Sequence, residues 1–174
     1  MDNNSRWLCV DPGETTGWSL WKGERLLGGG QTPLWAFAHD VYDAIKDNVG
    51  PLATGETDLL AAGVNAEDNV GQIELVVCEK FALYPWAAKD LAFDEFRTSQ
   101  LIGALTFTCA LHQVELHKQP ASIKERAMAG GAKELFVRPL HENRHQNDSI
   151  MHGVFYYQVE IRGVNLQIPD GTKK

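Results

Sequence analysis

The sequence predicts an α/β domain whose sheet begins with three antiparallel strands and carries helices on both faces. Residues 7–31 contain three β-prone runs separated by turn residues, which favours two consecutive hairpins. An amphipathic segment follows at 33–47, with apolar residues at helical spacing. The run 73–79 is almost continuously apolar, which is typical of a central strand covered by helices on both sides.

The composition bounds the domain count and the class of protein. The 174 residues, of which 44% are hydrophobic, suit one domain spanning 1–174. No apolar run is long enough to cross a bilayer and the N-terminus lacks signal-peptide features, so we expect a soluble, cytoplasmic protein. The net charge of −7 argues against coating of nucleic acid by bulk electrostatics, although it leaves room for a local basic face.

The first predicted strand ends in a carboxylate. Trp7 to Val10 is apolar and Pro12-Gly13 starts a turn, which places Asp11 at the end of the strand. A carboxylate beside a core is costly unless a metal, another cation or a hydrogen-bonding turn neutralises it. Two interpretations therefore stay open: Asp11 is a ligand, or it caps an Asp-Pro-Gly turn.

A second strand also ends in an acid. The stretch 50–71 has no sustained period and predicts a loop insertion, and the strand 73–79 that follows it ends in Glu79. Two neighbouring strands that each end in an acid can hold a divalent cation, because hard cations take oxygen ligands from several segments. The next segment is an aromatic loop, either simply packed or a platform for a nucleobase. Its aromatic residues include Phe81, Tyr84 and Trp86.

The second half predicts a long helix at 90–112, a strand at 114–117 and a helix at 120–128. In the long helix we expect Leu111 in the core stripe and Gly103 close to the sheet. The segment 117–138 has more basic than acidic residues in an otherwise acidic chain, which indicates a phosphate-facing surface or a solvated helix face. Its basic side chains are Lys118, Lys124, Arg126, Lys133 and Arg138.

The last predicted helix spans 147–160 and is followed by a flexible tail at 163–174. His145 and Asp148 are three residues apart, so both can face one point where this helix starts. Alternatively, Asp148 is an N-terminal cap and His145 a surface residue.

In this order, the motifs resemble those of the RuvC-type Holliday junction resolvases, a branch of the RNase H-like nucleases. The resemblance rests on the strand that ends in Asp-Pro-Gly, the strand that ends in Glu79, and the terminal helix opened by HxxD. It extends to a glycine-bearing helix at 100–105 and a lysine segment at 120–124, and covers 7–157. The insertion and the acidity look more like a phage-encoded or divergent member, which places the protein in a bacterial cell or a phage-infected host.

The resemblance implies an RNase H-like fold with a mixed five-stranded sheet. It implies that Asp11, Glu79 and Asp148 hold two Mg²⁺ or Mn²⁺ ions, with His145 as a fourth ligand or a hydrogen-bonding partner, and that Lys124 completes the catalytic set. Without metal, the carboxylates should repel one another and raise at least one pKa. The residues expected to contact DNA are Lys118, Lys124, Arg126, Lys133, Phe81, Tyr84 and Trp86.

The implied activity is a metal-dependent, structure-selective DNA endonuclease that resolves four-way junctions as a homodimer. An RNase H-like nuclease acting on flaps or RNA-containing substrates is the main alternative. An actin-like ATPase would use the 11–17 turn as a phosphate loop, but it needs a second related domain and a second such hairpin. A non-catalytic junction-binding protein would have no reason to keep all three acids.

Overall fold

A single five-stranded sheet forms the centre of the structure, a computed structural model that describes residues 4–47, 72–81, 96–136 and 143–166. The strands are β1 (Arg6–Asp11), β2 (Thr15–Lys22), β3 (Arg25–Pro33), β4 (Ile73–Glu79) and β5 (Glu115–Gln119). Their order is β3-β2-β1-β4-β5, with antiparallel pairing from β1 to β3 and parallel pairing of β1 with β4 and of β4 with β5. The predicted fold class is confirmed.

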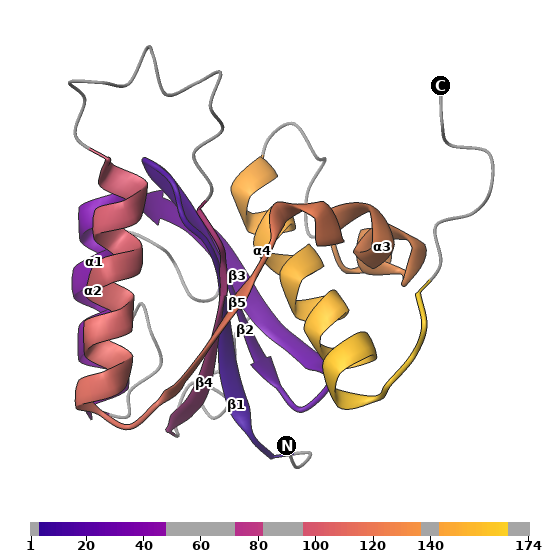
Figure 1. Cartoon of the computed structure of the whole chain (residues 1–174), viewed down its shortest axis with the longest axis horizontal. Coiled ribbons are helices and arrows are strands. Elements are labelled where there is room, and N and C mark those ends of the chain that lie inside the picture. Colours follow the sequence, from indigo (N-terminus) through magenta and orange to yellow (C-terminus); the bar gives the residue numbers. More distant parts are fainter. Residues whose placement is uncertain (1–3, 48–71, 82–95, 137–142, 167–174) are drawn as a thin grey trace.

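Helices cover both faces of the sheet (Figure 1). α1 (Leu34–Asp47) and α2 (Arg97–Leu111) lie on one face, and α3 (Lys124–Ala129) and α4 (Arg144–Phe155) lie on the other. We call these the α1/α2 face and the α4 face. Among the described residues, no helix is both long and apolar enough to cross a membrane.

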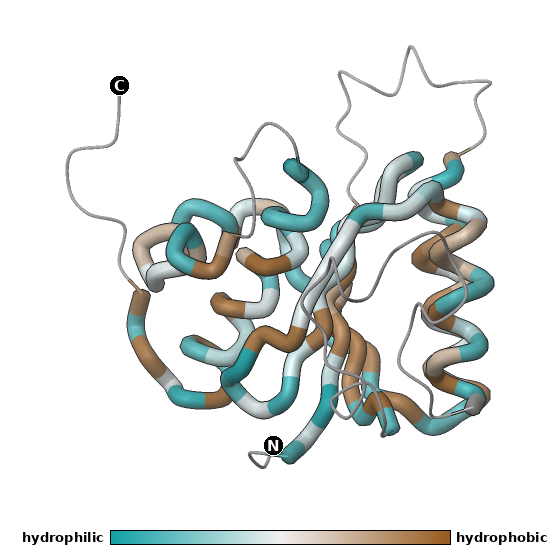
Figure 2. The backbone as a smooth tube through the Cα atoms, turned by 180° about the vertical axis from the view of Figure 1, so that it is seen from behind, coloured by the Kyte–Doolittle hydropathy of each residue, from teal (hydrophilic) through white to brown (hydrophobic). Residues whose placement is uncertain are grey.

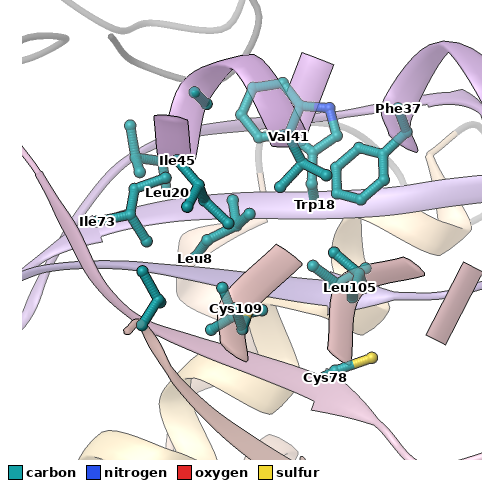
Figure 3. Close-up of a cluster of buried hydrophobic side chains, with 14 of the residues drawn as sticks. Leu8, Trp18, Leu20, Phe37, Val41, Ile45, Ile73, Cys78, Leu105 and Cys109 are labelled. Carbon is teal, nitrogen blue, oxygen red and sulfur yellow. The ribbon is translucent and has the colours of Figure 1, made fainter. Parts of the chain in front are cut away.

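The α1/α2 face buries a large apolar cluster (Figure 3). Leu8 of β1 and Phe37 of α1 are fully buried in it. α2 contributes side chains at four-residue spacing, because residues four apart share one side of a helix. These are Leu101, Leu105 and Cys109, each exposed by 1% or less.

Two expectations for α2 were wrong. Leu111 is 54% exposed, because it lies off the stripe that faces the sheet. Gly103 is exposed and has open space where a Cβ would stand, so it allows no close approach to the sheet.

α4 is buried on nearly all sides. Every residue from Gln146 to Phe155 is buried, because the sheet lies on one side of the helix and α3 packs against it from another. The helix passes close to β2, where a Cβ on Gly153 would overlap the indole of Trp21. α4 begins at Arg144, three residues before the predicted start at 147, and continues as a π-helix at Tyr156–Ile161.

Hydrophobic residues concentrate in the central strands and on parts of the helices (Figure 2). The predicted insertion at 50–71, residues 90–95 of the predicted long helix, and Tyr84, Trp86 and Arg138 lie outside the described residues. The α4 face buries a second apolar cluster, the α4-face cluster, which includes Trp7, Cys9, Val77 and Phe155. Of the predicted tail, 163–166 is described, and there Leu166 packs against this cluster.

Candidate active site

Asp11 and Glu79 lie side by side at the ends of two parallel strands. The register pairs Val10 with Cys78, so the next residue on each strand is one of the two acids. Side chains alternate along a strand. Cys9 and Val77 pack in the α4-face cluster, so Asp11 and Glu79, two residues further on, belong to the same face.

α4 brings His145 and Asp148 to the same ends of β1 and β4. The His145 Nδ1 lies 2.8 Å from Asp11 Oδ2. This contact depends on Gly17 in β2, where a Cβ would overlap the backbone carbonyl of His145. A glycine opposite Asp11 in the β1–β2 register therefore allows α4 to start directly against the sheet.

Lys124, the first residue of α3, lies among the three acids. Its Nζ is 2.7 Å from Asp148 Oδ2, 2.8 Å from Glu79 Oε2 and 3.4 Å from Asp11 Oδ1. We call Asp11, Glu79 and Asp148 the acid cluster. The ammonium group compensates the negative charge that these partly buried carboxylates bring together.

The structure adds two residues that sequence reasoning missed. His152 of α4 is fully buried, and its Nε2 lies 2.9 Å from Glu79 Oε2. Its Nδ1 lies 2.9 Å from Oε1 of Gln119, the last residue of β5. The spacing of His145, Asp148 and His152, at three and then four residues, could have indicated His152, because it repeats on one side of a helix. Gln119 carries no comparable signal.

The pKa of Asp11 is raised above its ordinary value. Burial is the largest cause, and the charges of Glu79 and Asp148 add to it. The hydrogen bond from His145 and the charge of Lys124 act in the opposite direction. The prediction that at least one carboxylate pKa would be raised is confirmed, with burial contributing more than repulsion.

The pKa of Glu79 moves the other way. Burial alone would raise it, but hydrogen bonds from His152 and Lys124 lower it to about 2. Burial alone would lower the pKa of Lys124, but its acidic neighbours outweigh burial and raise it. The hydrogen bond to Asp11 raises the pKa of His145. The site therefore favours an ionised Glu79 beside a protonated Lys124.

The alternative interpretations of the acids do not fit this geometry. Asp148 is the fifth residue of α4 and bonds Lys124, so the interpretation as an N-terminal cap was wrong. The carboxylate of Asp11 contacts His145 and Lys124, as a residue of a charged site does.

The donor set fits a hard divalent cation. Ligand atoms of Asp11, Glu79 and His152 all lie within 4.8 Å of one another. Asp148 contacts the same Lys124 ammonium group as Asp11 and Glu79. Carboxylate oxygens are the side-chain ligands that Mg²⁺ and Mn²⁺ prefer, so the three acids are the part of this group that suits such an ion.

The described residues among those expected to contact DNA lie on several elements. Phe81 is 38% exposed and lines a pocket of about 300 Å³ together with Glu79. Lys118 lies on the α1/α2 face, where its Nζ donates to Thr106 of α2. The guanidinium of Arg126 stacks on Phe155, and its Nε donates to the carbonyl of Leu166.

Only Lys124 among the predicted basic residues contacts the acid cluster in the described part of the chain. Lys133 is exposed in the short 3₁₀ helix Ala132–Leu135 that follows α3. Tyr84 and Trp86 lie outside the described residues. The structure therefore brings together the five predicted catalytic residues, whereas Lys118, Arg126 and Lys133 do not contact the acid cluster.

No protein-family model matches the sequence, and no curated protein matches it. The structure is similar to that of Thermus thermophilus RuvC in complex with a Holliday junction substrate, with a TM-score of 0.58 and 14% identity over 91% of this chain and 96% of that chain. A second structure of Thermus thermophilus RuvC gives a TM-score of 0.55 and 13% identity over 91% and 97%. The chain has the RuvC-like form of the RNase H-like fold.

Proposed function

We propose that this protein is a divalent-metal-dependent, structure-selective DNA endonuclease that resolves four-way junctions. The observation that carries the proposal is the acid cluster, assembled from the ends of β1 and β4 and the start of α4. The RuvC-like fold supports the assignment, since the matched neighbour was solved with a Holliday junction. Fold likeness alone does not choose a substrate, so the substrate needs a direct test.

The chemistry assigned to the site is hydrolysis of a phosphodiester bond. Bound divalent cations would activate water and stabilise the leaving 3′ oxygen, leaving a 5′-phosphate and a 3′-hydroxyl. Asp11, Glu79 and Asp148 would hold two such ions, and His145 orients Asp11 through the 2.8 Å contact or serves as a further ligand. Cations and Lys124 compete for the same carboxylates, so Lys124 would turn towards the scissile phosphate.

The pocket beside Glu79 is the proposed contact for an unstacked base. Its volume of about 300 Å³ is at the lower end of the range for small-ligand sites, which is about 300–1,000 Å³. The ring of Phe81 forms part of its wall, and aromatic faces bind bases of any sequence by stacking. Loss of junction opening in Phe81→Ala, with metal binding intact, would support this role.

Paired cuts across a junction need two active sites, so the proposal includes a homodimer. Phe107 and Leu111 of α2 are 68% and 54% exposed, on the face of the sheet that is opposite the acid cluster. A second copy packed there would bury both side chains and leave both acid clusters accessible to DNA. Light scattering should give twice the chain mass for the wild type and a lower mass for Phe107→Glu.

The test of the activity is cleavage of an end-labelled mobile four-way junction beside a matched duplex, a flap and an RNA–DNA hybrid. Each substrate is incubated with Mg²⁺, with Mn²⁺ or with EDTA, and Asp148→Asn serves as the inactive control. We expect paired, metal-dependent cuts in the junction that are absent from the variant.

Other outcomes redirect the assignment. Preference for the flap or the hybrid would retain the metal site and favour the alternative RNase H-like nuclease. Failure of the metal-loaded, folded protein to cut any of the substrates would overturn the nuclease assignment. The described residues form one sheet and include no second domain of the kind that an actin-like ATPase needs.

A further inference from the structure

A network of buried side-chain hydrogen bonds connects β5 through α4 to the acid cluster. Gln119, which is 2% exposed, pairs with Glu79 in the β4–β5 register. His152 bridges their side chains, with contacts of 2.9 Å to each. An apolar side chain would fill the place of His152 without the cost of burying an imidazole. Both ring nitrogens lie within hydrogen-bonding distance of a polar side chain, so His152 can bind Gln119 and Glu79 at the same time.

The available protons specify which group donates and which accepts in each of these hydrogen bonds. A neutral imidazole has one N–H, and a hydrogen bond to the ionised Glu79 requires that proton on Nε2. Nδ1 then accepts, and its neighbour must donate. Gln119 can donate once its amide is turned to present Nε2, and in the present orientation this Nε2 has no hydrogen-bond partner among the described residues. With the amide turned, Gln119 Nε2 donates to His152 Nδ1, so that both nitrogens have a partner.

We propose that His152, oriented by Gln119, is a positioning residue for Glu79. In the structure, Glu79 Oε2 accepts from both Lys124 and His152, at 2.8 and 2.9 Å. When Lys124 turns to a phosphate, His152 remains as the donor that holds the carboxylate. Its N–H keeps Glu79 from rotating away from Asp11 and Asp148. This inference rests on the proposed metal-dependent function, because it assigns Glu79 the role of a ligand.

The position of His152 in the fold favours this role over packing alone. His152 lies one turn of α4 after Asp148, so the same helix supplies one ligand and orients another. Groups that hydrogen-bond to metal ligands orient them, and their loss typically weakens metal binding by about 10–100-fold.

The test measures metal affinity without DNA, by calorimetric titration of the full chain with Mn²⁺. We expect His152→Phe to weaken binding about 10–100-fold. His152→Gln should retain most of the affinity, because a glutamine amide places an N–H near the position of the imidazole Nε2. Gln119→Met should have an intermediate effect. Val154→Ala removes buried volume from the same helix without touching Glu79, and should leave the affinity unchanged.

A second readout identifies the proton directly. Nitrogen-15 NMR of histidine-labelled protein should show His152 with its proton on Nε2, both before and after loading with Mg²⁺. Loss of the Nε2 proton on loading would make His152 a direct ligand and overturn the positioning role. Equal Mn²⁺ affinity in the wild type and His152→Phe would overturn the inference alone. Absence of metal binding by the wild type would overturn both the inference and the proposed function.

Discussion

The two faces of the sheet are built from the same strands but hold different chemistry. On the α1/α2 face, strand residues such as Leu8 and Val10 meet apolar side chains of two amphipathic helices. On the α4 face, apolar packing adjoins buried polar residues of one helix, including Asp148 and His152. Both faces thus supply apolar packing, but the α4 face also concentrates charge at the ends of the parallel strands.

The difference shows how a sheet separates stability from chemistry. Because side chains alternate along a strand, each residue is assigned to one face by its parity. Side chains on the two faces of the sheet can therefore differ in polarity while the strand itself stays the same. The α4 face tolerates its acids because Lys124 and His145 compensate them where the strands end.

The largest expected effect is the loss of cleavage in Asp11→Asn. Metal ions contribute several kcal/mol to such reactions, so loss of a ligand should lower the cleavage rate by about 10³-fold or more. Because the folded state raises the pKa of Asp11, its ionised form opposes folding near neutral pH. In EDTA, the variant should therefore melt at or above the temperature of the wild type.

The matched substitution on the other face should do the reverse. Leu8→Ala removes a fully buried side chain from the α1/α2 face and should lower the free energy of unfolding by about 2–5 kcal/mol. The fraction that remains folded should cut at the wild-type rate. A large loss of stability in Asp11→Asn, or of specific activity in folded Leu8→Ala, would contradict the separation of roles.

Gly17→Ala should lower cleavage by about 10²-fold. The added methyl group would overlap the His145 carbonyl and push the start of α4 away from Asp11. Displacement of a reacting group by about 1 Å can cost this much in rate. Gly103→Ala is the control, since a Cβ there meets open space, and it should leave cleavage unchanged. Similar rates for both variants would show that the close approach at Gly17 is dispensable.

Glu79 should give the fold a pH dependence that is opposite to that of Asp11. Its pKa falls from an ordinary 4.5 to about 2 in the fold. The stabilisation is therefore complete above about pH 4.5 and is lost as the pH falls towards about 2. In EDTA, the wild type should melt above Glu79→Gln at pH 6, and the gap should close on acidification. Calorimetry from pH 6 down to pH 2.5 measures this.

The control is Glu125→Gln, an exposed position on α3 that should show little difference from the wild type at any pH. A gap between the wild type and Glu79→Gln that stays constant with pH would contradict the lowered pKa of Glu79.

The smallest expected effect concerns Lys118, on the face opposite the acids. If Lys118 contacts DNA, Lys118→Ala should reduce the slope of log affinity against log salt by about 0.9 for each phosphate that the lysine neutralises. Cleavage of the bound junction should not change, because Lys118 does not reach the acid cluster. An unchanged salt slope would remove Lys118 from the residues that bind DNA.

The sequence by itself determined the main elements and the positions of the acids along the chain. Periods of two and 3.6 residues are local, so the strands that end in Asp11 and Glu79 were predicted correctly. The same alternation, extended along β5, would have placed Lys118 on the opposite face from Gln119. Local patterns therefore identify the face of a residue within an element.

The tertiary structure decided which side chains meet. The position of Lys124 among three acids and the bridge from Gln119 through His152 to Glu79 join strands and helices that are distant in sequence. The exposure of Leu111 likewise follows from how α2 rests on the sheet. These contacts depend on register and on the close approach of whole elements, such as α4 against Gly17, and the physical reason is that no local period encodes packing between separate segments.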